Sequence, residues 1–215
     1  MRLSTGALQA YGGAAELPGY DRSDVRPGIL HLGIGNFHRA HQAVTVDDLL
    51  AQAPGWGIRG ASLRRPDMAA ALAPQDGLYM LGIRSAEGLR ARVIGSVLSV
   101  ETGLEAAMGR MADPDIRLVT ITVTEKGYSP GGPLAQVLAG GLARRAAARA
   151  GSVTVLSCDN LAHNGARTGA LIRQAAPDGL QGWLDDQLAT PSSMVDRITP
   201  ATTQADRDEI LALTG

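Results

Sequence analysis

The chain has 215 residues, of which 45% are hydrophobic and 19% are charged. These proportions are typical of a folded globular domain and exclude disordered, collagen-like and membrane-spanning classes. The 20 basic and 21 acidic residues nearly balance, so no global positive field would attract a phosphate backbone, and nucleic acid is not an expected partner. A lone Cys158 cannot close an intramolecular disulfide, and no apolar signal segment opens the chain, so we expect a cytoplasmic protein with no membrane partner.

The predicted elements begin after an irregular leader at residues 1–27, which is rich in glycine, proline and small polar residues. Residues 28–32 form a short apolar run that ends in a glycine turn, and residues 37–52 then show helical spacing. Residues 57–63 form a second extended run. The first third of the chain therefore predicts a βαβ unit with parallel strands and a right-handed crossover.

Further strands and helices alternate beyond that unit. A helix at 65–72 precedes two strand-like segments, 79–83 and 91–100, which we expect to form a hairpin beside the main sheet. The remaining predicted elements are a helix at 104–111, a β-branched strand at 116–123, a helix at 133–150, a strand at 153–156, helices at 165–176 and 180–188, and a last helix at 204–213. This pattern predicts an α/β fold with a Rossmann-type, mostly parallel, doubly wound sheet and a small β-hairpin addition.

The glycine turn has the composition of a dinucleotide-binding loop. A first glycine permits the tight turn, and a second lets backbone N–H groups approach a pyrophosphate at the helix N-terminus. His38 replaces the third glycine of the usual fingerprint, so neighbouring side chains must fill the space between helix and strand differently. The candidate cofactor-binding residues in this turn are Gly33, Ile34, Gly35, Asn36, Phe37, His38 and Arg39, the last as a phosphate-facing cation. A plain glycine turn is the alternative.

Arg64 and Arg65 follow the second predicted strand, where NAD-binding sheets usually place an acidic residue. An arginine at this point, such as Arg64, can instead receive the 2′-phosphate of NADP, and a solvated arginine pair is the alternative. The cofactor preference between NAD and NADP therefore stays open. His38 and His41 lie one helical turn apart, but no further ligand pattern completes a metal site, so we expect no metal.

Polar residues follow two later strands, with Glu125 and Lys126 after the first and Asp159 and Asn160 after the second. Because ligands bind outside the carboxyl ends of strands in an open parallel sheet, these side chains are expected to converge there.

Four motifs in chain order then resemble the mannitol dehydrogenase family, which includes mannitol 2-dehydrogenase and fructuronate reductase. They are residues 32–42 (LGIGNFHRAHQ), 122–128 (TVTEKGY), 156–161 (LSCDNL) and 194–200 (MVDRITP), and the similarity runs from about Tyr20 to Thr203.

The resemblance implies zinc-independent, NAD(P)-dependent interconversion of a sugar alcohol or aldonate with its keto form. It implies that Asn160 donates a hydrogen bond to the substrate carbonyl, that Glu125 gates a proton or water, and that Asp196 positions the substrate. The expected ligands are therefore a polyol, a keto sugar or a hexuronate. An amide donor suits this chemistry because it stabilises charge on oxygen without ionising. A methyltransferase on the same sheet is a weaker alternative.

The sequence departs from the family pattern in two places. Only residues 129–132 separate Tyr128 from the next predicted helix, where relatives carry a longer insertion. Relatives also continue into a helical domain that contributes the lysine general acid/base, and Lys126 belongs to a different motif. We therefore expect a Rossmann domain at 28–203, with 204–215 beginning the connection to an absent C-terminal helical domain. Activity is expected to be impaired, and the alternative is a catalytically silent dinucleotide-binding module or truncated gene product. The face left by the absent domain is expected to expose apolar surface and to favour association.

Overall fold

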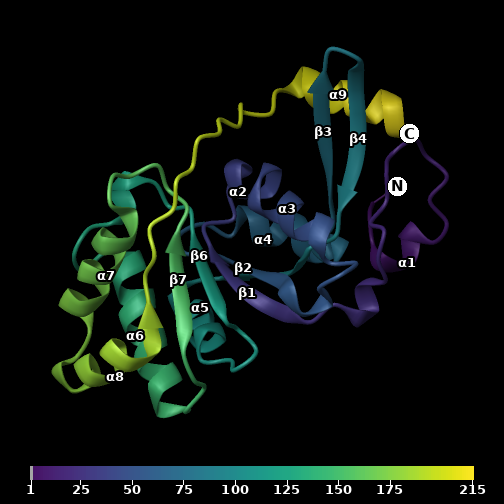
Figure 1. Ribbon diagram of the computed structural model, residues 1–215. Coiled ribbons are helices and arrows are strands. Elements are labelled where there is room, and N and C mark those ends of the chain that lie inside the picture. Colours follow the sequence, from purple (N-terminus) through teal and green to yellow (C-terminus); the bar gives the residue numbers. More distant parts are fainter. Residues whose placement is uncertain (1) are drawn as a thin grey trace.

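The computed structural model describes residues 2–215, and its main feature is a sheet of six parallel strands (Figure 1). The strands are β1 (Pro27–Leu32), β2 (Gly57–Ser62), β5 (Val97–Thr102), β6 (Leu118–Ile121), β7 (Val153–Ser157) and β8 (Leu188–Ala189). Their order across the sheet is β5-β2-β1-β6-β7-β8. Counted along the chain within this sheet, that is the 3-2-1-4-5-6 order of a dinucleotide-binding Rossmann sheet. The predicted fold class is therefore confirmed.

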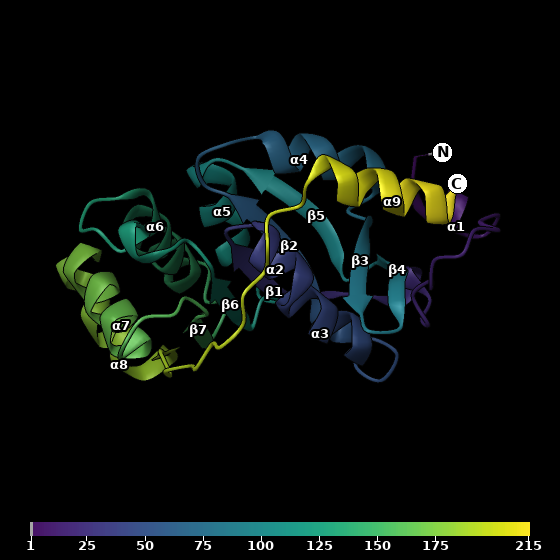
Figure 2. The same ribbon diagram turned by 90° about the horizontal axis from the view of Figure 1, so that it is seen from above.

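Helices cover both faces of this sheet (Figure 2). The helices are α2 (Asn36–Ala40), α3 (Gln42–Leu49) and α4 (Asp67–Leu72) on one face, and α5 (Leu104–Met111), α6 (Pro133–Ala147), α7 (Asn164–Ala175) and α8 (Gln181–Gln187) on the other. Successive side chains of β1 point to opposite faces of the sheet. Leu30 packs with α5 and α6, whereas Ile29 packs with α3 and α4. Both faces of the central strand are buried, which is why it reads as a continuous apolar run.

The predicted hairpin exists, but its second strand is shorter than expected. The hairpin pairs β3 (Tyr79–Ser85) with β4 (Gly88–Ile94) in an antiparallel ladder, and β5 begins separately at Val97 as an edge strand of the main sheet. The prediction of one strand over 91–100 is therefore wrong. The chain breaks because polar partners on α3 replace the strand ladder: the Gly95 N–H donates to Asp47 Oδ1 at 2.8 Å, and the Ser96 hydroxyl donates to the Ala43 carbonyl at 2.7 Å.

The helix expected over 37–52 is also interrupted. His41 has φ −131° and ψ −82°, which separates α2 from α3. The Tyr79 hydroxyl donates to the Arg39 carbonyl at 2.6 Å and so supplies a hydrogen bond from outside the helix near the break. Shorter 3-10 turns occur at Arg22–Asp24, Pro54–Trp56, Ala73–Gln75, Glu125–Gly127 and Asp178–Leu180.

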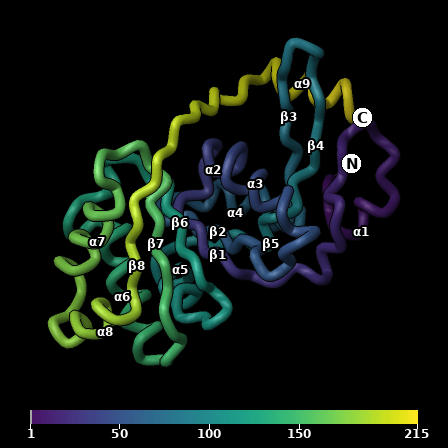
Figure 3. The backbone as a smooth tube through the Cα atoms, viewed as in Figure 1, coloured from purple at the N-terminus to yellow at the C-terminus, as the bar shows by residue number. Residues whose placement is uncertain are grey.

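The two ends of the chain meet on the hairpin (Figure 3). The leader, expected to be irregular, contains the short helix α1 (Thr5–Leu8). It packs apolar side chains against β4. Met1 lies outside the described residues. Helix α9 (Gln204–Thr214) packs Ile210 into the same apolar cluster as the leader, and Arg84 on β3 pairs with Glu209 at 2.7 Å. The hairpin is thus covered by segments from both termini.

Residues 190–203, called the strap below, run without regular structure from β8 to α9 (Figure 1). Asn164, the first residue of α7, holds the strap through two hydrogen bonds of 2.9 Å, one to the Ser193 carbonyl and one from the Ser193 N–H. A Cβ atom on Gly165 would lie 2.5 Å from the Thr190 carbonyl oxygen, so the strap lies directly on the helix backbone. Among residues 2–215, no helix has the length and apolarity needed to span a bilayer.

Candidate functional site

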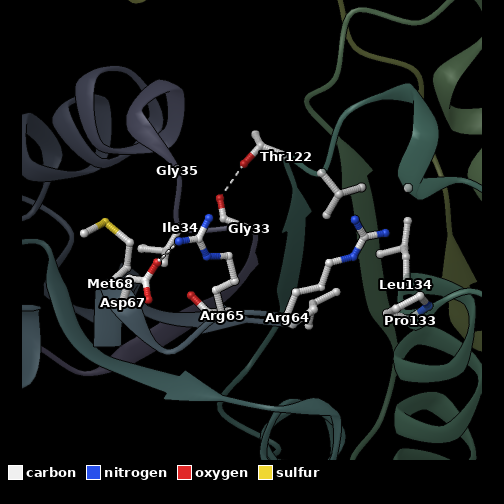
Figure 4. Close-up of a pocket in the computed structure, with 14 residues that line it drawn as sticks. Gly33, Ile34, Gly35, Arg64, Arg65, Asp67, Met68, Thr122, Pro133 and Leu134 are labelled. Atoms are coloured by element: carbon white, nitrogen blue, oxygen red, sulfur yellow. Dashed lines mark hydrogen bonds and ion pairs between the residues drawn. The ribbon is translucent and has the colours of Figure 1, made fainter. Parts of the chain in front are cut away.

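A cavity of about 340 Å³ opens at the carboxyl ends of β1, β2 and β6 (Figure 4). It is lined by Gly33, Ile34, Gly35, Ser62, Leu63, Arg64, Arg65, Asp67, Met68, Thr122, Val123, Gly127, Pro133 and Leu134. β1 and β6 are neighbours in the sheet although they are not consecutive in the chain, so the strand order reverses at this point. Open α/β sheets bind ligands at such a switch point. Of the predicted cofactor-binding residues, Gly33, Ile34, Gly35 and Arg64 line the cavity.

The glycine turn is held by one hydrogen bond to β2 and one from Thr122, the residue that follows β6. The Gly33 N–H donates to the Ala61 carbonyl of β2 at 3.0 Å, and the Thr122 hydroxyl donates to the Gly33 carbonyl at 2.7 Å. Gly33 has φ +106°, and a Cβ atom there would lie 2.1 Å from the Thr122 carbonyl oxygen. Only glycine can occupy this position without a shift of the backbone.

Gly35 differs from Gly33 because protein packing does not require its small size. Its φ of −77° is available to any residue, and the heavy atom nearest to the position of a Cβ atom is 4.0 Å away. Gly35 nevertheless lines the cavity and begins α2 without a side-chain cap. The missing side chain leaves open space where a ligand can approach the backbone, so this position fits a bound nucleotide.

His38 and His31 fill the space that a third glycine would have left between helix and strand. The ring of His38 on α2 stacks on that of His31 on β1, with centroids 3.4 Å apart and an interplanar angle of 11°. Burial lowers the pKa of His31 to about 3 and that of His38 well below its ordinary value. Both rings are therefore neutral at pH 7. Their stacked planes fill the space between β1 and α2.

The other predicted turn residues support the loop from behind and do not line the cavity. One guanidinium nitrogen of Arg39 donates to the Ile34 carbonyl at 2.8 Å, and another donates to the Asn36 side-chain oxygen. Phe37 lies with its ring centroid 5.2 Å from that of His41. The Arg39 guanidinium thus donates hydrogen bonds within the turn itself. Its role as a phosphate-facing cation stays a prediction.

Thr122 and Asp159 organise the loops at the carboxyl edge; the sequence placed Asp159 at this edge and Thr122 in a family motif, but assigned neither of them a contact with the glycine turn or with the turn after β6. The Thr122 hydroxyl and His31 Nε2 both contact the Gly33 carbonyl, at 2.7 and 3.0 Å. The Asp159 carboxylate accepts the Val123 N–H at 3.1 Å and the Tyr128 hydroxyl at 2.9 Å. The available signal was their position, because Thr122 directly follows β6 and Asp159 lies two residues after the end of β7.

The three predicted catalytic residues, Asn160, Glu125 and Asp196, have exposed side chains. Asn160 follows β7, Glu125 lies in the turn after β6 that Asp159 holds, and Asp196 lies on the strap. Glu125 has Arg167 of α7 at 3.9 Å. Within residues 2–215, no hydrogen bond or ion pair joins any two of the three, and no group of three or more metal-ligating side chains is present.

The sequence is similar to proteins of one family over nearly its whole length. The family model of the mannitol dehydrogenase Rossmann domain matches residues 27–213. Mannitol 2-dehydrogenase of Cereibacter sphaeroides is 41% identical over 89% of this chain and 47% of its own length, and the uncharacterized oxidoreductase YdfI of Escherichia coli K12 is 37% identical over 94% and 48%.

Two solved structures share the fold over essentially the whole chain. One is Pseudomonas fluorescens mannitol 2-dehydrogenase in a ternary complex with NAD and D-mannitol, with a TM-score of 0.89, 33% identity, and coverage of 100% of this chain and 51% of that one. The other is a substrate-free D-sorbitol dehydrogenase, also with a TM-score of 0.89, at 29% identity, which covers 99% of this chain and 51% of that one. The chain spans about half the length of the relatives it matches. It belongs to the mannitol dehydrogenase family and carries the Rossmann domain of that family.

Proposed function

We propose that the cavity binds a nicotinamide dinucleotide, NAD or NADP, and that the chain is the cofactor-binding part of an oxidoreductase for polyols, keto sugars or hexuronates. The observation that carries this proposal is the open space at Gly35, in a cavity at the switch point of a Rossmann sheet. Membership of the family and the likeness to a solved complex with NAD and D-mannitol support it.

The cavity lining matches the parts of a dinucleotide. The backbone at Gly33 and Gly35 suits a pyrophosphate, and the apolar side chains of Ile34, Leu63 and Met68 suit a flat base. When bound, the nicotinamide would supply the hydride acceptor or donor. The protein's own part is to hold and orient the nucleotide at the sheet edge.

Asn160, Glu125 and Asp196 are proposed to act on the substrate. The Asn160 amide is suited to donate a hydrogen bond to the substrate oxygen, where charge develops during reduction. Glu125 is suited to move a proton or admit water, and Asp196 to orient hydroxyl groups. Their exposure at the carboxyl edge and on the strap supports roles that face outward, toward a substrate.

The first test is nucleotide binding by the 215-residue chain. Titration of NADH and NADPH, followed by their fluorescence, should give saturable binding with at least one of them. S-adenosylmethionine serves as the control ligand, because a methyltransferase could use the same sheet. Binding of S-adenosylmethionine without binding of either nicotinamide nucleotide would refute the proposal.

Turnover is tested separately, with fructose and fructuronate as substrates. A second candidate function is binding without turnover, because within residues 2–215 no hydrogen bond or ion pair joins any two of Asn160, Glu125 and Asp196. A general acid/base group typically contributes about 10²- to 10⁴-fold, so a catalytic assembly that lacks one would be slow. Robust reduction by residues 1–215 would exclude this second candidate. In an active preparation, Asn160→Ala should lower kcat and leave the dinucleotide Kd unchanged, because the side chain is exposed.

Association through an apolar face is also proposed. Met194 and Ile198 on the strap are 88% and 96% exposed, and Leu211 on α9 is 64% exposed. Large apolar side chains with this exposure favour contact with another surface. Light scattering at increasing protein concentration should detect self-association, and a constant monomer mass would contradict it.

A further inference from the structure

The turn after β6 wraps around a single carboxylate, that of Asp159. The Val123 N–H donates to Asp159 Oδ2 at 3.1 Å, and the Thr124 N–H donates to Oδ1 at 3.0 Å. At the other end of the turn, the Tyr128 hydroxyl donates to Oδ2 at 2.9 Å. The carboxylate comes from the loop after β7, the neighbouring strand, and it holds the turn both where the chain enters it and where the chain leaves it.

Thr124 has a backbone conformation that is essentially restricted to glycine. Its φ is +70° and its ψ is 163°, and a residue with a side chain keeps such angles only where the surrounding structure imposes them. The Thr124 side chain is exposed and makes no hydrogen bond to another residue within 2–215, so it does not account for the conformation. The backbone does: the N–H is bonded to the Asp159 carboxylate, and the carbonyl accepts the Gly127 N–H at 2.9 Å. The bond to the carboxylate is the stronger of the two because its acceptor is charged.

This contact lies between two of the residues that are proposed to act on the substrate. Glu125 directly follows Thr124, and Asn160 directly follows Asp159. The backbone of Asp159 is held as well, because its carbonyl accepts the side-chain amide of Asn164 at 3.2 Å. One residue thus relates the backbone that carries Glu125 to the backbone that carries Asn160.

We propose that Asp159 is a positioning residue, whose carboxylate keeps Thr124 in its glycine-type conformation. In this way Asp159 sets where Glu125 lies relative to Asn160. The same turn forms part of the cavity wall, so its conformation also shapes the space for the nucleotide. The role in the reaction rests on the proposed function, whereas the contact between Asp159 and the turn needs no ligand and can be tested without one.

Amide hydrogen exchange of the ligand-free 215-residue chain, followed by NMR, tests the contact itself. Asp159→Asn keeps the size of the side chain but removes the charge and one acceptor oxygen. The amide of Thr124 or that of Val123 should then exchange at least about tenfold faster, as expected for the loss of a hydrogen bond to a charged group. Asp115→Asn is the matched control, because Asp115 is an exposed aspartate just before β6, and it should leave both amides unchanged. Unchanged exchange of both amides in Asp159→Asn overturns the proposal.

Thr124→Gly and Thr124→Ala test the backbone strain and leave Asp159 in place. Glycine adopts a positive φ without strain, whereas alanine does not. Thr124→Gly should therefore unfold at a higher urea concentration than Thr124→Ala. This is the reverse of the usual order, in which the more flexible unfolded chain of a glycine variant makes it the less stable of the two. A Thr124→Ala variant that is as stable as Thr124→Gly, or more stable, overturns the strain and the proposal with it.

A double variant tests whether Asp159 acts through the turn. Asp159→Asn should weaken binding of the nicotinamide nucleotide by about fivefold and, in an active preparation, lower kcat by about 10- to 100-fold, because displaced groups react slowly. Adding Thr124→Gly should restore both values to within about twofold of the parent, since glycine keeps the conformation without the carboxylate. An action of the Asp159 charge on the ligand predicts no such recovery, so the absence of recovery overturns the proposal.

The results also separate this inference from the proposed function. A parent chain that binds neither NADH nor NADPH overturns the proposed function and the positioning role together, while the exchange experiment still decides whether Asp159 holds the turn. Nucleotide binding that Asp159→Asn leaves unchanged, with faster exchange of the two amides, keeps the proposed function and overturns the positioning role.

Discussion

Alanine substitutions at Gly35 and Gly33 separate ligand binding from folding, because the two glycines lie in the same turn but in different surroundings. A methyl group on Gly35 meets open space, and φ −77° is available to alanine. Replacing glycine also reduces the entropy of the unfolded chain, by about 0.4–1 kcal/mol. We therefore expect Gly35→Ala to change the free energy of unfolding by less than about 1 kcal/mol.

Gly33→Ala adds the same methyl group where there is no room. A φ of +106° is strained for alanine, at a cost of about 1–3 kcal/mol. The Cβ atom would also lie 2.1 Å from the Thr122 carbonyl oxygen, so β6 or the turn must move and the Thr122–Gly33 hydrogen bond is weakened as well. A total loss of about 3 kcal/mol or more is expected.

Urea denaturation and calorimetric titration of the favoured dinucleotide measure the two effects on the same preparations. Gly35→Ala should keep the parent's unfolding midpoint and lose at least about tenfold in nucleotide affinity, or 1.4 kcal/mol, because the methyl group occupies the space of backbone approach. Unchanged affinity in Gly35→Ala would show that no ligand uses this space. An unchanged midpoint in Gly33→Ala would refute the packing argument.

Two further predictions concern buried titratable residues. Burial keeps the pKa of His31 at about 3 and depresses that of His38 too, so below their ordinary value of 6.5 the unfolded chain binds more protons than the native one. The free energy of unfolding should thus fall as the pH drops from 6.5 toward 3, by up to about 1.4 kcal/mol per pH unit for each histidine. Urea denaturation of His38→Phe over this pH range should show a flatter slope. Asp47 is buried and accepts bonds from Arg92 at 2.7 Å and from the Gly95 N–H at 2.8 Å, so Asp47→Ala should cost about 3 kcal/mol. Asp48→Ala, which removes an exposed partner of the same arginine, should cost less than about 1 kcal/mol, and equal losses would contradict this account.

Local signals in the sequence were enough to predict the parallel sheet and the glycine turn. The apolar runs at 28–32 and 153–156 and the helical spacing at 104–111 correspond closely to β1, β7 and α5, because burial on a sheet or helix imposes a period that short segments display. Gly33 was predicted for its conformational freedom, and its positive φ agrees with that reason.

Other features depended on partners that are far away in the chain. The breaks at His41 and at Gly95 arise where Tyr79 and Asp47 supply hydrogen bonds from other elements, and no local periodicity records such partners. The same holds for the stacking of His38 on His31. The sequence by itself determined the order of the elements and the position of the turn, since both follow from nearest-neighbour conformational preferences. Only the tertiary structure decided which side chains face the cavity and which brace it, because that depends on contacts between strands that are separated by up to about a hundred residues.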